Sequence, residues 1–172
     1  MCNRKPPLTR LALIASGLLT SALAMAQQET TIGNVEWSSD GNSTMRTEGD
    51  SRILEMQDNV RVTQGTLVIN GDEAVFEYDA ATNELLKVTV IGTPVNYQQT
   101  AEDAQPVTGS SETIILYREA DTQETILEFI GDAVVISADS TMHCQAIVYL
   151  ADQELIREAT GPCQGTLNSS SN

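Results

Sequence analysis

The sequence is poor in positive charge. Nine lysines and arginines stand against 24 aspartates and glutamates, which gives a formal net charge of −15 at pH 7. Such a charge repels nucleic acid and anionic membrane surfaces. The basic residues beyond position 26 are scattered along the chain and form no stripe of the kind that a nucleic-acid-binding protein needs. These residues are Arg46, Arg52, Arg61, Lys87, Arg118 and Arg157. We therefore expect no nucleic-acid partner.

Histidine is almost absent, and this scarcity argues against several kinds of chemistry. His143 is the one histidine, whereas nucleophilic triads and dyads need a base beside the nucleophile. Its position directly beside Cys144 is not a standard zinc-ligand spacing. Gly65, Gly71 and Gly92 are isolated, so no glycine-rich phosphate loop occurs. We predict a protein that is not an enzyme and has no cofactor and no metal site. A hydrolase that uses His143 is a minor alternative.

A long apolar run stands at the N-terminus. Three basic residues between positions 4 and 10 precede an apolar run from Leu11 to Leu23, and Ala24-Met25-Ala26 follows as a small-x-small cleavage pattern. We predict a cleavable signal peptide over residues 1–26. Its removal takes away three basic residues and no acidic ones, which leaves six against 24 and a net charge of −18. The alternative is an uncleaved membrane anchor, because no charge interrupts the stretch up to Gln28.

Cysteine is also scarce. Two cysteines, Cys144 and Cys163, remain in the chain that follows the predicted signal peptide. An oxidising compartment permits them to form a disulfide, which would add about 3 kcal/mol by the chain-entropy estimate for a loop of this size. The alternative is a pair of unbonded, buried thiols.

Alternation of apolar and polar residues dominates from Arg52 onward. Leu54, Met56, Val60 and Val62 share one face of an extended strand, and polar residues take the other face. Further alternating runs follow, which we expect to end at Asn70-Gly71 and at Gly92-Thr93-Pro94. A sustained 3.6-residue period is missing, so the pattern predicts an all-β protein of short antiparallel strands.

An internal repeat supports this prediction. A shift of 73 residues aligns Leu54-Glu55-Met56 with Leu127-Glu128-Phe129, Val62 with Val135, and Phe76 with Tyr149. A smaller unit, in which a tyrosine precedes a polar turn and another strand, begins at Tyr78, Tyr117 and Tyr149. Repeated hairpin-like units predict stacked strand pairs. In the repeat, His143 falls at the position of Asn70.

Four segments together resemble a known family. The stretch from Asp58 to Asp72 contains Asn59-Val60-Arg61-Val62-Thr63-Gln64-Gly65, which resembles the "G/D-N-V-x-V-x-Q-G" strand-turn of the periplasmic lipopolysaccharide-export bridge proteins, the LptA-type, OstA-like family. Weaker matches follow in the family's order at Gly92–Gln99, Val107–Ser111 and Gly131–Ala133. The resemblance runs from about residue 35 to residue 164.

The resemblance implies a fold and a location. The fold would be a two-sheet, V-shaped antiparallel β-jelly roll with open ends, also called a β-taco, which we assign to residues 27–165. Residues 166–172 would form a disordered tail. The family also implies that the protein lies in the periplasm, where the acyl chains of lipopolysaccharide occupy an apolar groove while the glycan stays in water.

The family further implies partners. Subunits would join head to tail into a homo-oligomer, and the bridge would connect an inner-membrane export complex with an outer-membrane translocon. A membrane-anchored, LptC-like component of the same pathway and a structural β-repeat protein with a closed core are the alternatives. The residues predicted to line the groove and bind lipid are Leu54, Met56, Val60, Val62, Leu67, Ile69, Phe76, Val88, Phe129, Val135, Met142 and Tyr149.

Overall fold

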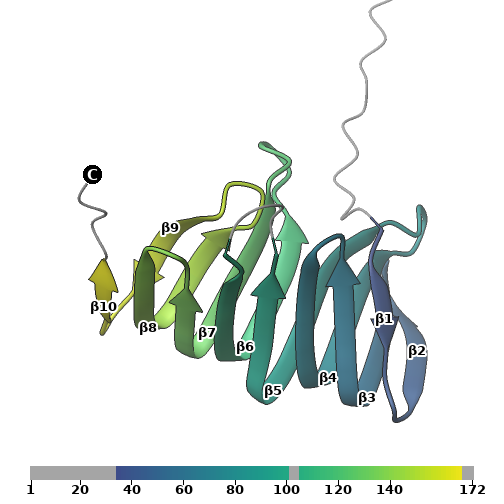
Figure 1. The fold of residues 1–172 in the computed structure, drawn as a ribbon. Coiled ribbons are helices and arrows are strands. Elements are labelled where there is room, and N and C mark those ends of the chain that lie inside the picture. The colour runs from purple at the N-terminus through teal and green to yellow at the C-terminus, as the bar shows by residue number, and fades with distance from the viewer. Residues whose placement is uncertain (1–33, 101–104, 168–172) are drawn as a thin grey trace, which may run out of the picture.

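The computed structural model describes residues 34–100 and 105–167, and these residues form ten antiparallel strands and no helix (Figure 1). The predicted all-β antiparallel fold is confirmed. The signal peptide predicted over residues 1–26 lies outside the described residues. The strands are β1 (Glu36–Ser38), β2 (Ser43–Glu48), β3 (Ser51–Gln64), β4 (Leu67–Asp79), β5 (Leu85–Gln99), β6 (Val107–Arg118), β7 (Thr125–Ile136), β8 (Ser140–Leu150), β9 (Leu155–Thr160) and β10 (Gln164–Leu167).

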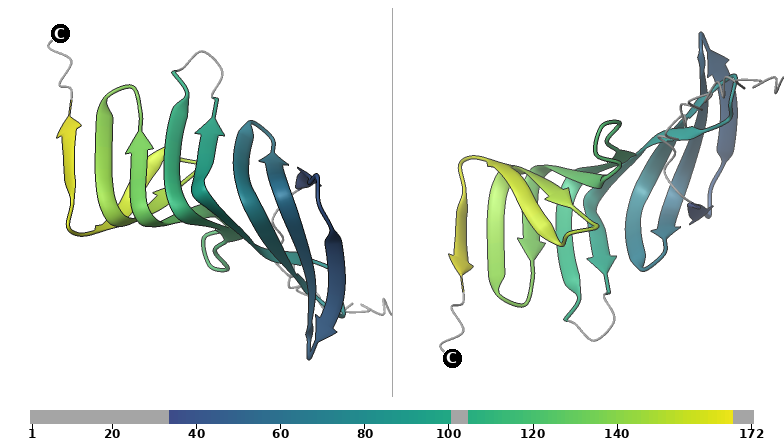
Figure 2. Two further views of the ribbon diagram at one scale, coloured as in Figure 1. Left: turned by 90° about the horizontal axis from the view of Figure 1, so that it is seen from below. Right: turned by 90° about the horizontal axis from the view of Figure 1, so that it is seen from above.

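Each long strand from β3 to β8 takes part in two layers. The sheet has the order β1-β3-β4-β5-β6-β7-β8-β10, with β2 also paired to β3 and β9 also paired to β8. Each long strand bends near its middle, so the two halves of one sheet face each other (Figures 1 and 2). We call the half that contains β2 and β9 layer A, and the half that contains β1 and β10 layer B. The two sheets that the sequence predicts are therefore two halves of one folded sheet.

The bends form one row across the sheet, which we call the crease. Register shifts mark this row between Gln57 and Val60, Asn70 and Glu73, Ile91 and Val95, Ser110 and Thr113, and Ile130 and Ala133. Extra residues in one strand of a pair disrupt the ladder locally and bend the strand. The crease is therefore a line of bulges, and it turns a flat sheet into a V.

The internal repeat is present in the backbone at the crease. Asp58 and Asn59 in β3 have φ values of 63° and 49°, and Gly131 and Asp132 in β7 have φ values of 80° and 49°. These pairs lie 73 residues apart. Asx residues and glycine are the ones that tolerate this left-handed conformation. The repeated pair therefore bends the first and the fifth long strands in the same way.

Two predicted strand ends are wrong. Asn70-Gly71 lies inside β4 and Gly92-Thr93-Pro94 lies inside β5, and both strands continue past the crease. Close packing leaves no room for a side chain at Gly71, because an added Cβ would lie 2.5 Å from Val90 Cγ1. Residues typical of turns serve here to bend a strand and let a neighbouring backbone approach closely.

The tail prediction needs a correction at its start. Thr166 and Leu167 belong to β10, where they pair with Thr141 and Ser140 of β8. The backbone pairing of an edge strand orders these two residues, although their side chains are exposed. Residues 168–172 lie outside the described part of the chain.

Both edges of the folded sheet are interrupted strands. At the N-terminal edge, β1 pairs with the layer B half of β3 and β2 pairs with its layer A half. At the C-terminal edge, β9 pairs with the layer A half of β8 and β10 with its layer B half. Figure 1 places these edges at opposite ends of the molecule. Side chains at both edges are mostly exposed.

Candidate functional site

The space between the layers collects the residues that were predicted to line a groove. Eleven of the twelve are buried, and Met142 is partly buried against them. They belong to one continuous core, which contains side chains from both halves of each long strand. The structure therefore brings the twelve residues together, and whether they bind lipid stays a prediction.

The layers touch in the middle of the molecule. Tyr97 of layer B meets Phe129 of layer A with ring centroids 5.4 Å apart, and near the N-terminal edge Trp37 meets Phe76 at 6.4 Å. Gly109 allows the first contact, because an added Cβ would lie 2.7 Å from the Phe129 ring. The slot is thus filled by the protein's own side chains, so a ligand must displace these contacts to lie between the layers.

The ends of the slot differ from its middle. Trp37 and Met45, opposite the inward-facing Val62 and Leu54, are 44% and 58% exposed at the N-terminal edge. Leu155 and Leu167 are 52% and 84% exposed at the C-terminal edge. A shallow hollow of about 270 Å³ lies beside β10 between Met142 and Leu167. Both ends therefore present apolar side chains to water.

The long opening opposite the crease, which we call the mouth, is bridged by a hydrogen bond from Gln99 to Ala151. Gln99 Nε2 at the end of β5 donates to the Ala151 carbonyl at 3.1 Å, and the Tyr97 hydroxyl donates to Gln99 Oε1 at 2.5 Å. A hollow of about 310 Å³ lies at this point and is lined from both layers, with Arg118 and Asp152 among its residues. Sequence reasoning missed Tyr97, Gln99 and Ala151, because nothing local shows which strand lies opposite β5.

Two tyrosines lie below this bridge. The rings of Tyr97 and Tyr149 meet edge to face with centroids 6.0 Å apart. Burial raises the pKa of Tyr149 to about 12, with a further contribution from Glu154, and burial also raises the pKa of Tyr97. The Tyr149 hydroxyl is fully buried and makes no hydrogen bond of normal geometry with any described residue. Both tyrosines therefore stay protonated at neutral pH; the Tyr97 hydroxyl donates to Gln99, and the Tyr149 hydroxyl is a neutral donor without an acceptor in normal geometry.

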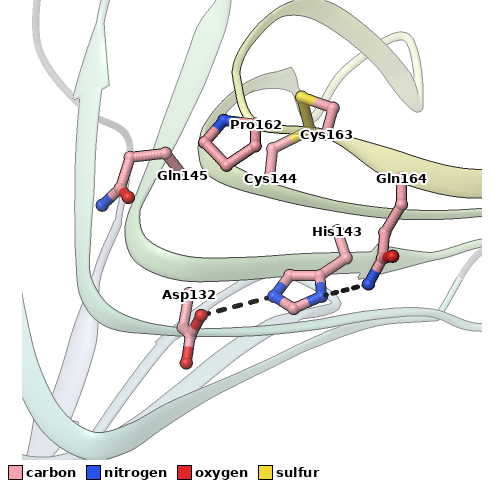
Figure 3. Close-up of a pocket in the computed structure, with 7 residues that line it drawn as sticks. All are labelled: Asp132, His143, Cys144, Gln145, Pro162, Cys163 and Gln164. Atoms are coloured by element: carbon pink, nitrogen blue, oxygen red, sulfur yellow. Dashed lines mark hydrogen bonds and ion pairs between the residues drawn. A yellow bond between two sulfur atoms is a disulfide. The ribbon is translucent and has the colours of Figure 1, made fainter.

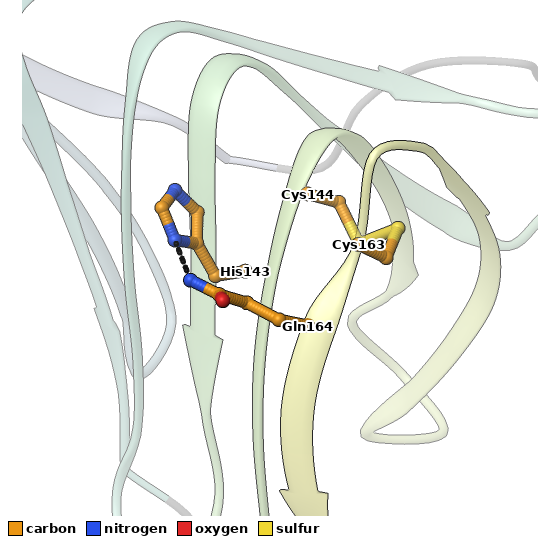
Figure 4. Close-up of a disulfide and its surroundings, with 4 residues drawn as sticks. All are labelled: His143, Cys144, Cys163 and Gln164. Atoms are coloured by element: carbon orange, nitrogen blue, oxygen red, sulfur yellow. Dashed lines mark hydrogen bonds between the residues drawn. A yellow bond between two sulfur atoms is a disulfide. The ribbon is translucent and has the colours of Figure 1, made fainter.

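A disulfide fixes the C-terminal edge. Cys144 in β8 is bonded to Cys163, just before β10, and the Cα atoms lie 4.2 Å apart (Figure 4). Gln164 pairs with His143 as Asn96 pairs with Asn70, so by strand register Cys163 takes the place of Val95. The bond ties the interrupted β9–β10 strand to β8 at the crease.

His143 lies on the outer face of layer B. Its Nε2 is 3.4 Å from Asp132 Oδ1, and its Nδ1 is 3.3 Å from Gln164 Nε2. These residues line an open hollow of about 280 Å³ with Cys144, Gln145, Pro162 and Cys163 (Figure 3). Across residues 34–100 and 105–167, no group of three or more potential metal ligands occurs. The contacts of His143 connect β7, β8 and β10.

The outer faces of the two layers differ in charge. Layer A carries the outward acids of the alternating strands, among them Glu55 paired with Arg46 at 2.5 Å and Glu77 paired with Lys87 at 2.8 Å. Among the described residues, the strand-paired outward positions of layer B from β3 to β10 hold no carboxylate, and Asp132, which contacts His143, lies at the crease. These positions are Arg61, Thr63, Val68, Asn70, Asn96, Gln98, Thr108, Ser110, Val134, Ile136, Thr141, His143, Gln164 and Thr166.

Comparisons with known proteins agree on one family. A family model described as "LptA/(LptD N-terminal domain) LPS transport protein" matches residues 38–155. The chain is 24% identical over 159 residues to the lipopolysaccharide export system protein LptA of Haemophilus influenzae, covering 91% of this chain and 88% of that protein.

The fold has a counterpart among solved structures. The crystal structure of LptH, the LptA-homologous periplasmic component of the lipopolysaccharide transport device of Pseudomonas aeruginosa, matches with a TM-score of 0.62 and 21% identity. The match covers 79% of this chain and 96% of that one, and it confirms the predicted β-jelly roll or β-taco fold. Within the described residues, no helix has the length and apolar character needed to cross a membrane.

Proposed function

We propose, since this chain belongs to the LptA/(LptD N-terminal domain) family of LPS transport proteins, that it binds lipopolysaccharide in the periplasm by taking the acyl chains between its two layers. The single observation that carries the proposal is the core shared by both layers of an open-ended folded sheet. That core is apolar along its whole length, and its two ends are exposed.

Acyl chains would replace contacts that the layers now make with each other. Each CH₂ group moved out of water gains about 0.8 kcal/mol, and this gain does not depend on specific polar contacts. Exchanging a contact between two side chains for a contact between a side chain and an acyl chain keeps the interior apolar. The crease supports such opening, because bulges interrupt the ladder where the layers would rotate apart.

The ends of the slot suggest where the exchange begins. Trp37 and Met45 at one end and Leu155 and Leu167 at the other are already exposed. Edge strands with unpaired backbone groups accept further strands. We propose that copies of the chain join head to tail through these edges, with β9 and β10 of one copy beside β1 and β2 of the next. The inner-membrane export complex and the outer-membrane translocon would be the partners at the two ends.

Photo-crosslinking in cells tests the binding site. A crosslinking residue at Met56, Phe76 or Phe129, which face the interior, should capture lipopolysaccharide. Glu55 and Arg61 are matched controls, because they lie on the same strand as Met56 and face outward on layers A and B. Capture at the control positions alone would overturn the proposal and favour the structural β-repeat alternative with a closed core.

The location and the leader need their own test. We propose export to the periplasm with removal of residues 1–26, on the basis of the basic residues, the apolar run and the small-x-small pattern at the N-terminus. The intact mass of the protein isolated from the periplasm should correspond to a chain that begins at Gln27. A membrane-bound protein that keeps these residues would instead support the LptC-like alternative.

A further inference from the structure

The interior contains one polar group that the fold itself does not explain. The Tyr149 residue is 1% exposed, and its buried hydroxyl makes no hydrogen bond of normal geometry with any described residue. The neighbouring Tyr97 hydroxyl interacts with it but donates its own proton to Gln99. Leaving a buried donor unpaired is unfavourable, so native proteins rarely keep one without a reason. The ring alone would fill the same space as phenylalanine, which the chain uses at the neighbouring interior position Phe129.

The surroundings of Tyr149 place this hydroxyl below the mouth. Its ring lies against Tyr97, whose hydroxyl donates to Gln99 Oε1, and Gln99 in turn donates to the carbonyl of Ala151. Gln99 and Ala151 both line the 310 Å³ hollow that opens at the mouth between the two layers. One chain of contacts thus leads from the unpaired hydroxyl to the surface.

The chemistry of this cluster is that of neutral donors and acceptors next to an apolar slot. Phenol hydroxyls, an amide and a backbone carbonyl recognise other neutral polar groups. In a glycolipid, the neutral polar groups next to the acyl chains are the amide and ester carbonyls that join those chains to the sugar. Acyl chains held in the slot would bring that level to the mouth, because the sugar must remain in water.

We propose that Tyr97, Gln99, Tyr149 and the Ala151 carbonyl form a subsite for the acyl-linkage carbonyls of a glycolipid, with the Tyr149 hydroxyl donating directly to the ligand. In the absence of lipid, the hydrogen bond from Gln99 to the Ala151 carbonyl closes the mouth. When the layers part, this bond breaks and the Gln99 amide binds the ligand instead. This inference rests on the proposed function, and it adds to acyl burial a contact that recognises the linkage.

Replacement of the hydroxyl alone tests the subsite. The full-length exported protein and its Tyr149→Phe variant are titrated with lipid A and, separately, with the apolar probe N-phenylnaphthylamine. We expect Tyr149→Phe to weaken lipid A binding about five- to tenfold, the effect of one hydrogen bond, and to leave binding of the apolar probe unchanged. Equal affinity of the variant and the parent for lipid A would overturn the subsite.

Matched controls distinguish loss of the carbonyl contact from a loss of folding or of phosphate recognition. Tyr117→Phe removes a hydroxyl on the outer face of layer A, where it donates to Glu128, and should leave lipid A binding unchanged. Circular dichroism should show Tyr149→Phe folded and at least as heat-stable as the parent without lipid, because an unpaired group is removed.

A second ligand separates the carbonyl contact from phosphate recognition. Tyr149→Phe should weaken binding of lipid A without phosphate groups by the same factor, and a loss confined to the phosphorylated form would overturn the carbonyl assignment. If the parent binds neither lipid A nor the probe, the proposed function itself fails.

Discussion

Asp79 shows how a single carboxylate closes a turn at the mouth. Its Oδ1 accepts hydrogen bonds from the backbone N–H groups of Ala81 and Thr82, each at 2.8 Å. These bonds, led by the one from Thr82, hold the pKa of Asp79 below its ordinary value. A lowered pKa in the folded state contributes stability above the pKa of the unfolded chain, and that contribution is lost as the pH falls through the folded pKa.

The substitution Asp79→Asn should therefore act in a pH-dependent way. At pH 7 we expect a fall of a few degrees in the melting temperature, since a neutral amide oxygen is a weaker acceptor than a carboxylate. As the pH falls towards 2, through the lowered pKa of Asp79, more of the parent carboxyl becomes protonated as well, so the difference should shrink. Thermal unfolding followed by circular dichroism at both pH values measures it. Asp121→Asn, at the exposed tip of the next turn, serves as the control, and an equal deficit at both pH values would contradict the argument.

At the scale of elements, the sequence predicts strands better than it predicts their ends. Alternation in residues 54–62 predicts which side chains are buried, because burial of one face of a strand needs no knowledge of the partner strand. Asn70-Gly71 and Gly92–Pro94 carry the same residues as a turn but lie at the crease inside β4 and β5. Only pairing with distant strands distinguishes a bend from a turn, and that information is not local.

For the candidate site, the sequence predicts which side chains face the interior but not which of them meet across the two layers. Period-two alternation identifies the inward face, so the twelve predicted groove residues do lie in one core. The bridge from Gln99 to Ala151 joins residues 52 positions apart, and the contact between Tyr97 and Phe129 depends on how far the layers fold over. The sequence could not predict these contacts, because they depend on which distant strands face each other across the fold. It also could not show whether the inward face lines a closed core or a groove, because both have the same alternating pattern.

The disulfide stabilises the element at the C-terminal edge. Cys144 and Cys163 are 19 residues apart and enclose β9 and most of β8. Closing a loop of this size removes entropy from the unfolded chain, so we expect the Cys144→Ala/Cys163→Ala variant to lose about 3 kcal/mol of unfolding free energy. Urea denaturation measures the loss.

A second measurement separates the bond from the substitutions. Reduction of the parent protein should lower its unfolding free energy by about as much as the double substitution does. The double variant should not respond to the reductant. Because β10 is exposed and reaches the sheet through β8 alone, hydrogen exchange should accelerate in β10 more than in β4. Equal stability of the reduced and oxidised parent would contradict this role.

At the scale of the whole molecule, the proposed head-to-tail joining would make the two interrupted edges a heterologous pair. A contact between one edge and the opposite edge of another copy does not close, so it extends a chain of copies. We expect light scattering to show a concentration-dependent series of oligomers. Leu167→Asp places a charge among the exposed inward side chains of β10 and should abolish this series. Thr166→Asp, which points to the outer face, is the matched control, and a strict monomer in the parent protein would contradict the proposal.

The net charge of −15 determines how the affinity for lipid A should depend on salt. A phosphate-binding protein with a basic site loses affinity as salt is added, and we expect the opposite here. Lipopolysaccharide carries phosphate groups. The mouth, where we propose that it binds, is lined by both Asp152 and Arg118, and the outer carboxylates such as Glu55 and Glu77 add a repulsive field. Salt screens such repulsion over about 10 Å at 0.1 M and leaves acyl burial intact. We therefore expect the affinity for lipid A to rise about two- to threefold between 50 and 300 mM NaCl, as measured by titration below the lipid's aggregation concentration. The neutral probe N-phenylnaphthylamine should show no such rise. A fall in lipid A affinity with salt would mean that cationic contacts to phosphate, not the apolar interior, dominate binding.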